Sequence, residues 1–167
     1  FRSVTQFFVQ DQKSADLLHQ LGVRQVVVVG DTRFDRVITI AEQAKSLPTQ
    51  AKLLYVFTQS AYSNATGQEG LDAVLVGAAF EQTVSLLFLY DGIYQLKADQ
   101  DMQASGIKQY TKTFQALADY DVENIYVSAL CLQARSLNAC DLILETQALN
   151  RDAIASLISE QDRVFTF

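Results

Sequence analysis

The stretches LLYVF at residues 53–57 and VSLLFL at residues 84–89 decide the fold of this chain. Each is a short, unbroken apolar run, which is typical of a strand buried on both faces of a parallel sheet. Between them, apolar residues recur at helical spacing at Leu71, Val74 and Ala78. Parallel strands need crossover connections, so a helix between two buried strands predicts an α/β fold with helices on both faces of the sheet.

The same alternation continues to residue 167. Three more strands are expected, at Ile125–Leu130, Leu142–Leu144 and Val164–Phe167. Helices are expected over about Ile107–Ala118, in a short segment through Arg135, and after the N-cap Asn150. Thr66 and Glu69 match a capping box at the start of the first helix. Residues 51–167 therefore predict a parallel five-stranded sheet.

The first fifty residues predict a shorter unit. Phe7–Val9 and Val26–Val29 have the composition of strands, and a helix is expected between them, from its N-cap Ser14 to its stop at Gly22. Phe34–Ala44 has helical spacing. Pro48, which interrupts a helix, indicates a boundary near residue 50. We therefore expect two parts, an incomplete β-α-β fragment over residues 1–50 and a complete domain over residues 51–167.

Charge changes at the same place. Residues 1–50 carry six basic and five acidic side chains, whereas residues 51–167 carry seven basic and fourteen acidic ones. An acidic body repels phosphate backbones, so direct nucleic-acid binding is not expected. The chain has 49% hydrophobic residues, but no apolar run approaches the ~20 residues of a membrane span. It also shows no basic-then-apolar leader. We therefore expect a cytoplasmic protein that binds no membrane.

Few residues suggest a bound metal or cofactor. Cys131 and Cys140 do not have a CxxC spacing, and His19 is the single histidine, so neither a metal site nor a disulfide is expected. Neither GxGxxG nor GxxxxGK[ST] occurs, which removes the common phosphate-binding loops. We therefore expect no metal and no cofactor.

Five motifs in residues 52–167 resemble the TusC/DsrF family of sulfur-relay subunits. They are KLLYVF at 52–57, GQEGLDA at 67–73, FLYDGIYQL at 88–96, LADYDV at 117–122 and DRVFTF at 162–167. The resemblance implies a flavodoxin-like fold and a place in a hetero-oligomer with TusB-like and TusD-like siblings, in contact with small persulfide carrier proteins. It also implies a sulfurtransferase complex that works toward 2-thiouridine at the tRNA wobble position or, alternatively, in dissimilatory sulfur oxidation.

The resemblance gives this type of subunit a structural role, with the working cysteine on a sibling. In this resemblance, the position that corresponds to the sibling's working cysteine lies near Ser128, and serine cannot carry a persulfide. Cys131, one helical turn later, is the alternative sulfur carrier, ahead of Cys140. Tyr90, Asp91 and Gly92 follow a central strand, where open parallel sheets bind ligands or partners, although Asp91-Gly92 also fits a simple turn. Together with Ser128 and Cys131, these three residues are the candidates for a partner interface.

Residues 1–50 resemble a different family, the lipid A Kdo transferases. The resemblance is carried by FFVQD at 7–11, SADLL at 14–18 and GDTRFDRV at 30–37. It covers a fragment of a Rossmann domain without the catalytic acid or most of the sugar-nucleotide pocket, so glycosyl transfer is not expected. A Kdo glycosyltransferase remnant and a generic flavodoxin-like ligand binder remain as alternative functions. Such a fragment buries little core alone, which predicts that it docks weakly on the second part or stays mobile beside it.

Overall fold

The computed structural model describes residues 7–9, 16, 26–28, 33–48, 50–63, 65–98, 100 and 110–167. Its elements are the strands β1 (Phe7–Val9), β2 (Val26–Val28), β3 (Lys52–Phe57), β4 (Thr83–Phe88), β5 (Asn124–Ser128), β6 (Gln147–Leu149) and β7 (Arg163–Thr166), the α-helices α2 (Arg33–Ser46), α3 (Thr66–Ala79), α4 (Ala129–Ala134) and α5 (Arg151–Ser159), and the 3-10 helices η1 (Tyr90–Gln95), η3 (Thr111–Tyr120) and η4 (Ala139–Asp141). The helix expected after Ser14 and the first residues of the one expected from Ile107 lie outside the described residues.

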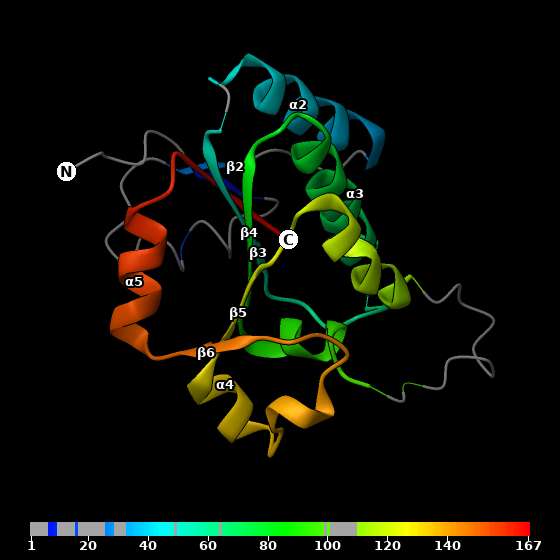
Figure 1. The fold of residues 1–167 in the computed structure, drawn as a ribbon, viewed down its shortest axis with the longest axis vertical. Helices are drawn as coiled ribbons and strands as arrows, with labels where there is room; N and C mark the ends of the chain where they lie inside the picture. The colour runs from blue at the N-terminus through cyan, green and yellow to red at the C-terminus, as the bar shows by residue number, and fades with distance from the viewer. Residues whose placement is uncertain are drawn as a thin grey trace.

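The strands form one parallel sheet in the order β2-β1-β7-β3-β4-β5-β6 (Figure 1). Its part within residues 51–167 is the predicted five-stranded parallel sheet, which confirms the α/β fold class. Residues 1–50 extend this sheet, because β1 pairs with β7 through Phe7↔Val164 and Phe8↔Phe165. The helix expected over Phe34–Ala44 is α2, and it packs beside α3 with Ile40 and Ala44 buried.

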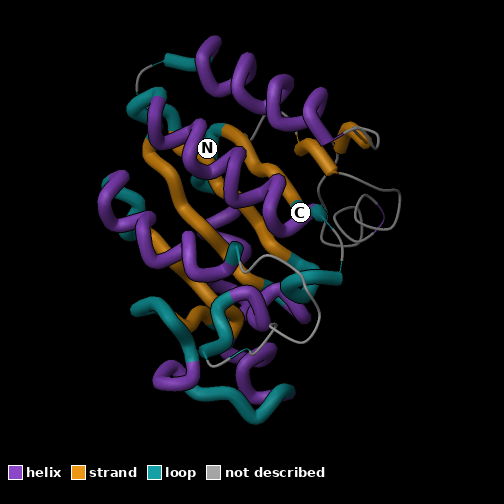
Figure 2. Tube along the Cα trace, turned by 90° about the vertical axis from the view of Figure 1, so that its right-hand side faces the viewer, coloured by secondary structure: helices purple, strands orange, loops and turns teal. Residues whose placement is uncertain are grey.

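Helices cover both faces of the sheet. Figure 2 shows α2, α3 and η3 in rows over one face, and α5 lies on the opposite side of the strands in Figure 1. The larger core lies under α3 and η3, where the rings of Phe57 and Phe88 stack at a centroid distance of 4.9 Å and Phe114 meets both edge-on. The smaller core lies under α5, whose Ile154, Leu157 and Ile158 pack on buried strand residues such as Leu54 and Leu87.

Two helix starts test the predicted caps. Asn150 caps α5 as expected, since its side chain accepts from the amide of Ala153 at 2.9 Å. The capping box predicted at Thr66 and Glu69 is wrong: Ala65 is the N-cap of α3 and makes no side-chain cap bond, while Thr66 is the first helical residue and is buried.

The strand predicted at Leu142–Leu144 is also wrong. Leu142 makes only an isolated antiparallel bridge to Lys97, and the amide of Ile143 donates to the carbonyl of Leu96 at 2.8 Å. These residues are apolar because they pack against the larger core as a loop. The fifth strand is β6, which pairs with β5 from Tyr126↔Gln147 onward and is largely exposed.

Candidate functional site

The residues singled out from the sequence meet at the carboxyl ends of two neighbouring strands. β4 and β5 pair in parallel up to Phe88↔Val127, so both chains leave the sheet at the same edge. After β4 the chain turns into η1, and after β5 it turns into α4, which lies at the lower end of β5 in Figure 1. The two short helices pack against each other. We call η1, α4 and Arg135 together the carboxyl-edge site.

Cys131 joins the two helices. Its Sγ accepts a hydrogen bond from the backbone amide of Tyr90 at 3.2 Å, and the half-buried side chain packs against the larger core. The backbone amide of Cys131 donates in turn to the hydroxyl of Ser128 at 3.3 Å. Ser128 is therefore the N-cap of α4, with a side chain that is 5% exposed. The strand expected to reach Leu130 ends at this cap.

An ion pair makes a second connection. The guanidinium of Arg135 donates to Oδ1 of Asp91 through Nη2 at 2.6 Å and Nε at 3.1 Å. It also donates to the carbonyl oxygen of Cys131 at 3.3 Å and lies 5.9 Å from the ring centre of Tyr94. The hydrogen bond to Asp91 raises the pKa of Arg135 above its ordinary value, so the guanidinium stays charged.

The backbone of η1 has two special positions. Tyr90 has a φ of 48°, in the left-handed region that non-glycine residues rarely adopt. Gly92 is buried, and a Cβ there would overlap the carbonyl oxygen of Phe57 and lie 2.5 Å from its carbonyl carbon. The expected simple turn at Asp91-Gly92 is therefore a turn of 3-10 helix pressed against the end of β3.

A buried polar network anchors the far end of η1. Gln95, which is fully buried, donates to the carbonyl oxygen of Gln59 at 3.0 Å and accepts from the hydroxyl of Tyr110 at 3.1 Å. Burial raises the pKa of the Tyr110 hydroxyl well above its usual value, and the neighbouring Tyr62 adds to the rise. The tyrosine is therefore a neutral donor, which fixes the orientation of the Gln95 amide.

The outer surface of the site is partly apolar. Tyr90 is 45% exposed on η1 and Leu130 is 62% exposed on α4. Tyrosine is enriched in the buried centre of protein–protein interfaces. Cys140 lies apart from these residues in the sequence, in η4, and is exposed.

Sequence reasoning selected five of these residues as candidates for a partner interface but missed Arg135. The available signal was the position of Arg135 four residues after Cys131 on a short helix, which puts the two on one helical face. No group of three or more histidine, cysteine or acidic side chains suited to hold a metal occurs among the described residues. Within the same part of the chain, every helix is too short or too polar to cross a lipid bilayer.

Residues 51–167 have the sequence of a known class of protein. Residues 51–167 match the model of the DsrE/DsrF-like family, and the chain belongs to that family. A solved neighbour, the ychN protein of E. coli, superposes with a TM-score of 0.60 at 16% identity, covering 71% of this chain and 100% of its own. This likeness confirms the fold.

Relatives with known names are more similar in sequence. The intracellular sulfur oxidation protein DsrF of Allochromatium vinosum is 36% identical over 130 residues, covering 70% of this chain and 96% of DsrF. The TusC homologues of Vibrio vulnificus strain CMCP6 and Pasteurella multocida are 31% and 34% identical, each over 70% of this chain and 99% of their own. These findings confirm the TusC/DsrF resemblance of residues 52–167. The Kdo transferase resemblance of residues 1–50 and the boundary near residue 50 stay predictions.

Proposed function

We propose that this chain is a subunit of a sulfur-relay complex and that it binds partner subunits through the carboxyl-edge site. Membership of the DsrE/DsrF-like family and similarity to proteins named DsrF and TusC homologue support the relay. One observation carries the binding surface: exposed Tyr90 and Leu130 stand on two helices that Cys131 and the Asp91–Arg135 pair fasten together. Such a surface is preorganised, so this chain loses little conformational entropy when a partner binds.

We infer a structural role for Cys131 rather than a sulfur-carrying one. A persulfide carrier presents a thiolate that another protein can reach. Cys131 is instead half-buried, packs on the core and holds η1 through the amide of Tyr90. In the relay, the acceptor thiolate of one protein attacks the outer sulfur of a donor persulfide on another. The donor's S–S bond breaks as the acceptor's forms, and the donor leaves as a thiolate without any external oxidant.

The finer assignment is a TusC-like subunit in the cytoplasm, in contact with TusB-like and TusD-like siblings and with small persulfide carriers. Its sulfur would end as 2-thiouridine at the tRNA wobble position. The relatives named TusC homologue support this reading. The fourteen acidic side chains of residues 51–167 disfavour RNA on this subunit, so another member of the complex would hold the tRNA.

A second candidate is a subunit of dissimilatory sulfur oxidation. The 36% identity to the intracellular sulfur oxidation protein DsrF supports it. Deleting the gene in the source organism separates the two endpoints. A fall in wobble 2-thiouridine by nucleoside mass spectrometry supports tRNA thiolation, and a fall in sulfur oxidation with unchanged 2-thiouridine supports the second candidate.

The binding surface is tested by affinity purification of tagged full-length chain from the source cell. Wild type should recover sibling sulfur-relay subunits, and Tyr90→Ala combined with Leu130→Ser should recover at least about tenfold less, as expected for the loss of a central aromatic contact. The matched control is Ile38→Ser, which removes an apolar side chain that is 53% exposed on α2. Equal recovery of siblings by the double variant and by the control would show that the carboxyl-edge site is not the interface. Absence of siblings from the wild-type purification would contradict the proposed role in a sulfur relay.

A further inference from the structure

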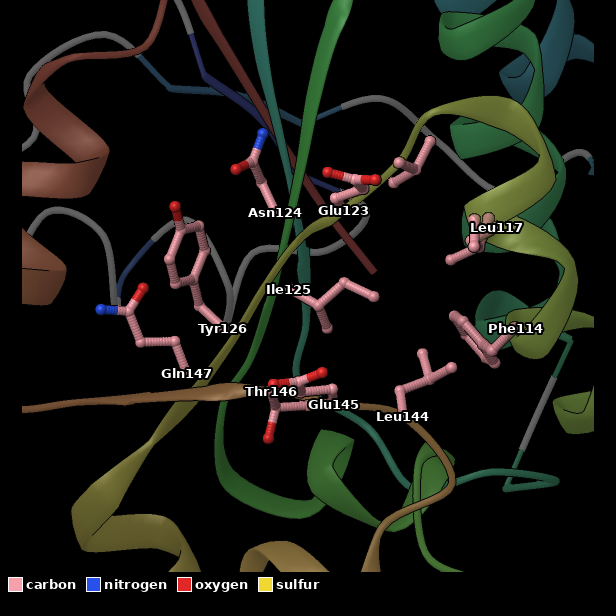
Figure 3. A pocket seen from close by; sticks show the side chains of 12 residues that line it. Phe114, Leu117, Glu123, Asn124, Ile125, Tyr126, Leu144, Glu145, Thr146 and Gln147 are labelled. Atoms are coloured by element: carbon pink, nitrogen blue, oxygen red, sulfur yellow. The ribbon is translucent and has the colours of Figure 1, made fainter.

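A groove opens at the end of β5 that is opposite to the carboxyl-edge site. It has a volume of about 630 Å³ and lies between η3, the first residues of β5 and the segment that leads into β6 (Figure 3). The sheet itself creates the space, because β6 first pairs with β5 at Tyr126↔Gln147. The chain before Gln147 diverges from Asn124 and Ile125, and the resulting wedge reaches the surface.

The groove has an apolar side and an acidic rim. In Figure 3, Phe114 and Leu117 point from η3 toward Ile125, and Leu144 approaches from the segment before β6. The rim carries the carboxylates of Glu123 and Glu145, both exposed, and the twelve lining residues include no lysine, arginine or histidine.

The surrounding charge strengthens the rim. Asp119 and Asp121, also exposed, lie within four residues of Glu123, and Lys112 at the start of η3 is the cation on that helix. Beside Glu145, the Oγ1 of Thr146 is buried and has no hydrogen-bond partner among the described residues.

We propose that this groove binds a basic, partly apolar peptide segment of a partner protein. An arginine or lysine side chain fits both features, because its methylene stem packs on an apolar wall while its charged end reaches carboxylates. The proposal does not depend on the sulfur relay. It gives the subunit a second contact at the opposite end of β5, so two partners can be held at once.

The test uses the isolated full-length chain and a fluorescein-labelled, end-blocked peptide of sequence Arg-Val-Arg-Val-Arg. Binding should perturb the amide resonances of residues 123–126 and 145–147, and the acidic peptide Glu-Val-Glu-Val-Glu should leave them unchanged. Glu123→Gln with Glu145→Gln should weaken binding about fivefold, the loss of two exposed ion pairs. The control, Glu81→Gln with Glu160→Gln, removes the same charge from exposed positions elsewhere and should leave binding within a factor of two of the wild type.

A steric variant separates the groove from charge alone. Ala118→Trp places a large side chain in the groove from an exposed position of η3. This variant should weaken binding of the basic peptide without destabilising the fold. Two results would contradict peptide binding in the groove. One is an equal loss of affinity in the Glu123/Glu145 variant and in the Glu81/Glu160 control, and the other is wild-type affinity in Ala118→Trp. Binding of spermidine at these resonances without binding of the peptide would assign the groove to a small polyamine and overturn the peptide proposal.

Discussion

The backbone amide of Tyr90 donates a hydrogen bond to the Sγ of Cys131 at 3.2 Å, although 41 residues separate them in the chain. The bond joins η1, which follows β4, to α4, which follows β5. The thiol of Cys131 therefore makes a structural contact, whereas a sulfur carrier would present its thiol to another protein. The consequences of this contact can be measured directly.

Replacing Cys131 by serine should leave sulfur transfer nearly intact. The serine hydroxyl can still accept from the amide of Tyr90, and the half-buried position tolerates the change, so the free energy of unfolding should fall by no more than about 1 kcal/mol. Transfer is measured with the assembled complex and a persulfide-loaded donor protein. Loss of transfer in this variant, with the complex still assembled, would give Cys131 a catalytic role.

Gly92→Ala should destabilise the chain by more than about 2 kcal/mol, because its methyl group would overlap backbone atoms of Phe57 that cannot move without disturbing β3. Urea unfolding followed by circular dichroism measures the change. As a reference, Ala134→Gly alters an exposed helical position and should cost about 1 kcal/mol or less. A Gly92→Ala protein as stable as the wild type would contradict the close approach of η1 to β3.

Asp91→Ala should weaken partner binding more than it weakens the fold. Asp91 is 61% exposed, and such ion pairs contribute about 1 kcal/mol or less to stability. Recovery of partners should nevertheless drop, since Arg135 loses the group that fixes η1 against α4. Asp152→Ala, which removes an exposed acid of α5, serves as control and should leave partner recovery unchanged. Unchanged recovery would show that the pair has no part in the interface.

Tyr110→Phe should lower the free energy of unfolding at pH 7 by about 1–3 kcal/mol, because the buried Gln95 loses a hydrogen-bond donor. Tyr120→Phe, at a 50% exposed tyrosine, is the matched control and should be neutral.

The same tyrosine gives an alkaline pH dependence. Its pKa is raised in the folded state, so above about pH 10 the unfolded chain releases the proton while the folded chain keeps it, and wild-type stability falls as pH rises. Tyr110→Phe should lose part of this slope between about pH 10 and 12. Identical slopes in the two proteins would contradict a buried, neutral Tyr110.

The sequence predicts the central strands well because their signal is burial on both faces. Leu53–Phe57 and Val84–Leu89 agree with β3 and β4 to within one residue at each end. β6 was missed because its residues are largely exposed and carry no apolar run, whereas the apolar Leu142–Leu144 is a loop on the core. Apolar composition reports burial, and a loop can be buried.

The site was predictable to the extent that it follows from strand order. Tyr90 and Cys131 meet because carboxyl ends of neighbouring parallel strands share an edge. The Asp91–Arg135 pair could not be predicted from the sequence, because it joins residues 44 apart and depends on the direction of the short helix after β5. Side-chain pairs of this kind follow from the packed backbone, which the sequence alone does not give.

The strand at one edge of the sheet, β6, has three residues, and three residues of β2 are described at the other edge. A foreign strand that paired with β6 would gain few backbone hydrogen bonds, and short outer strands are one way in which natural sheets resist stacking into aggregates. Growth of this sheet by strand addition is thus poorly rewarded at β6. In the proposed complex, a partner would gain more by contacting side chains at the carboxyl ends of the strands.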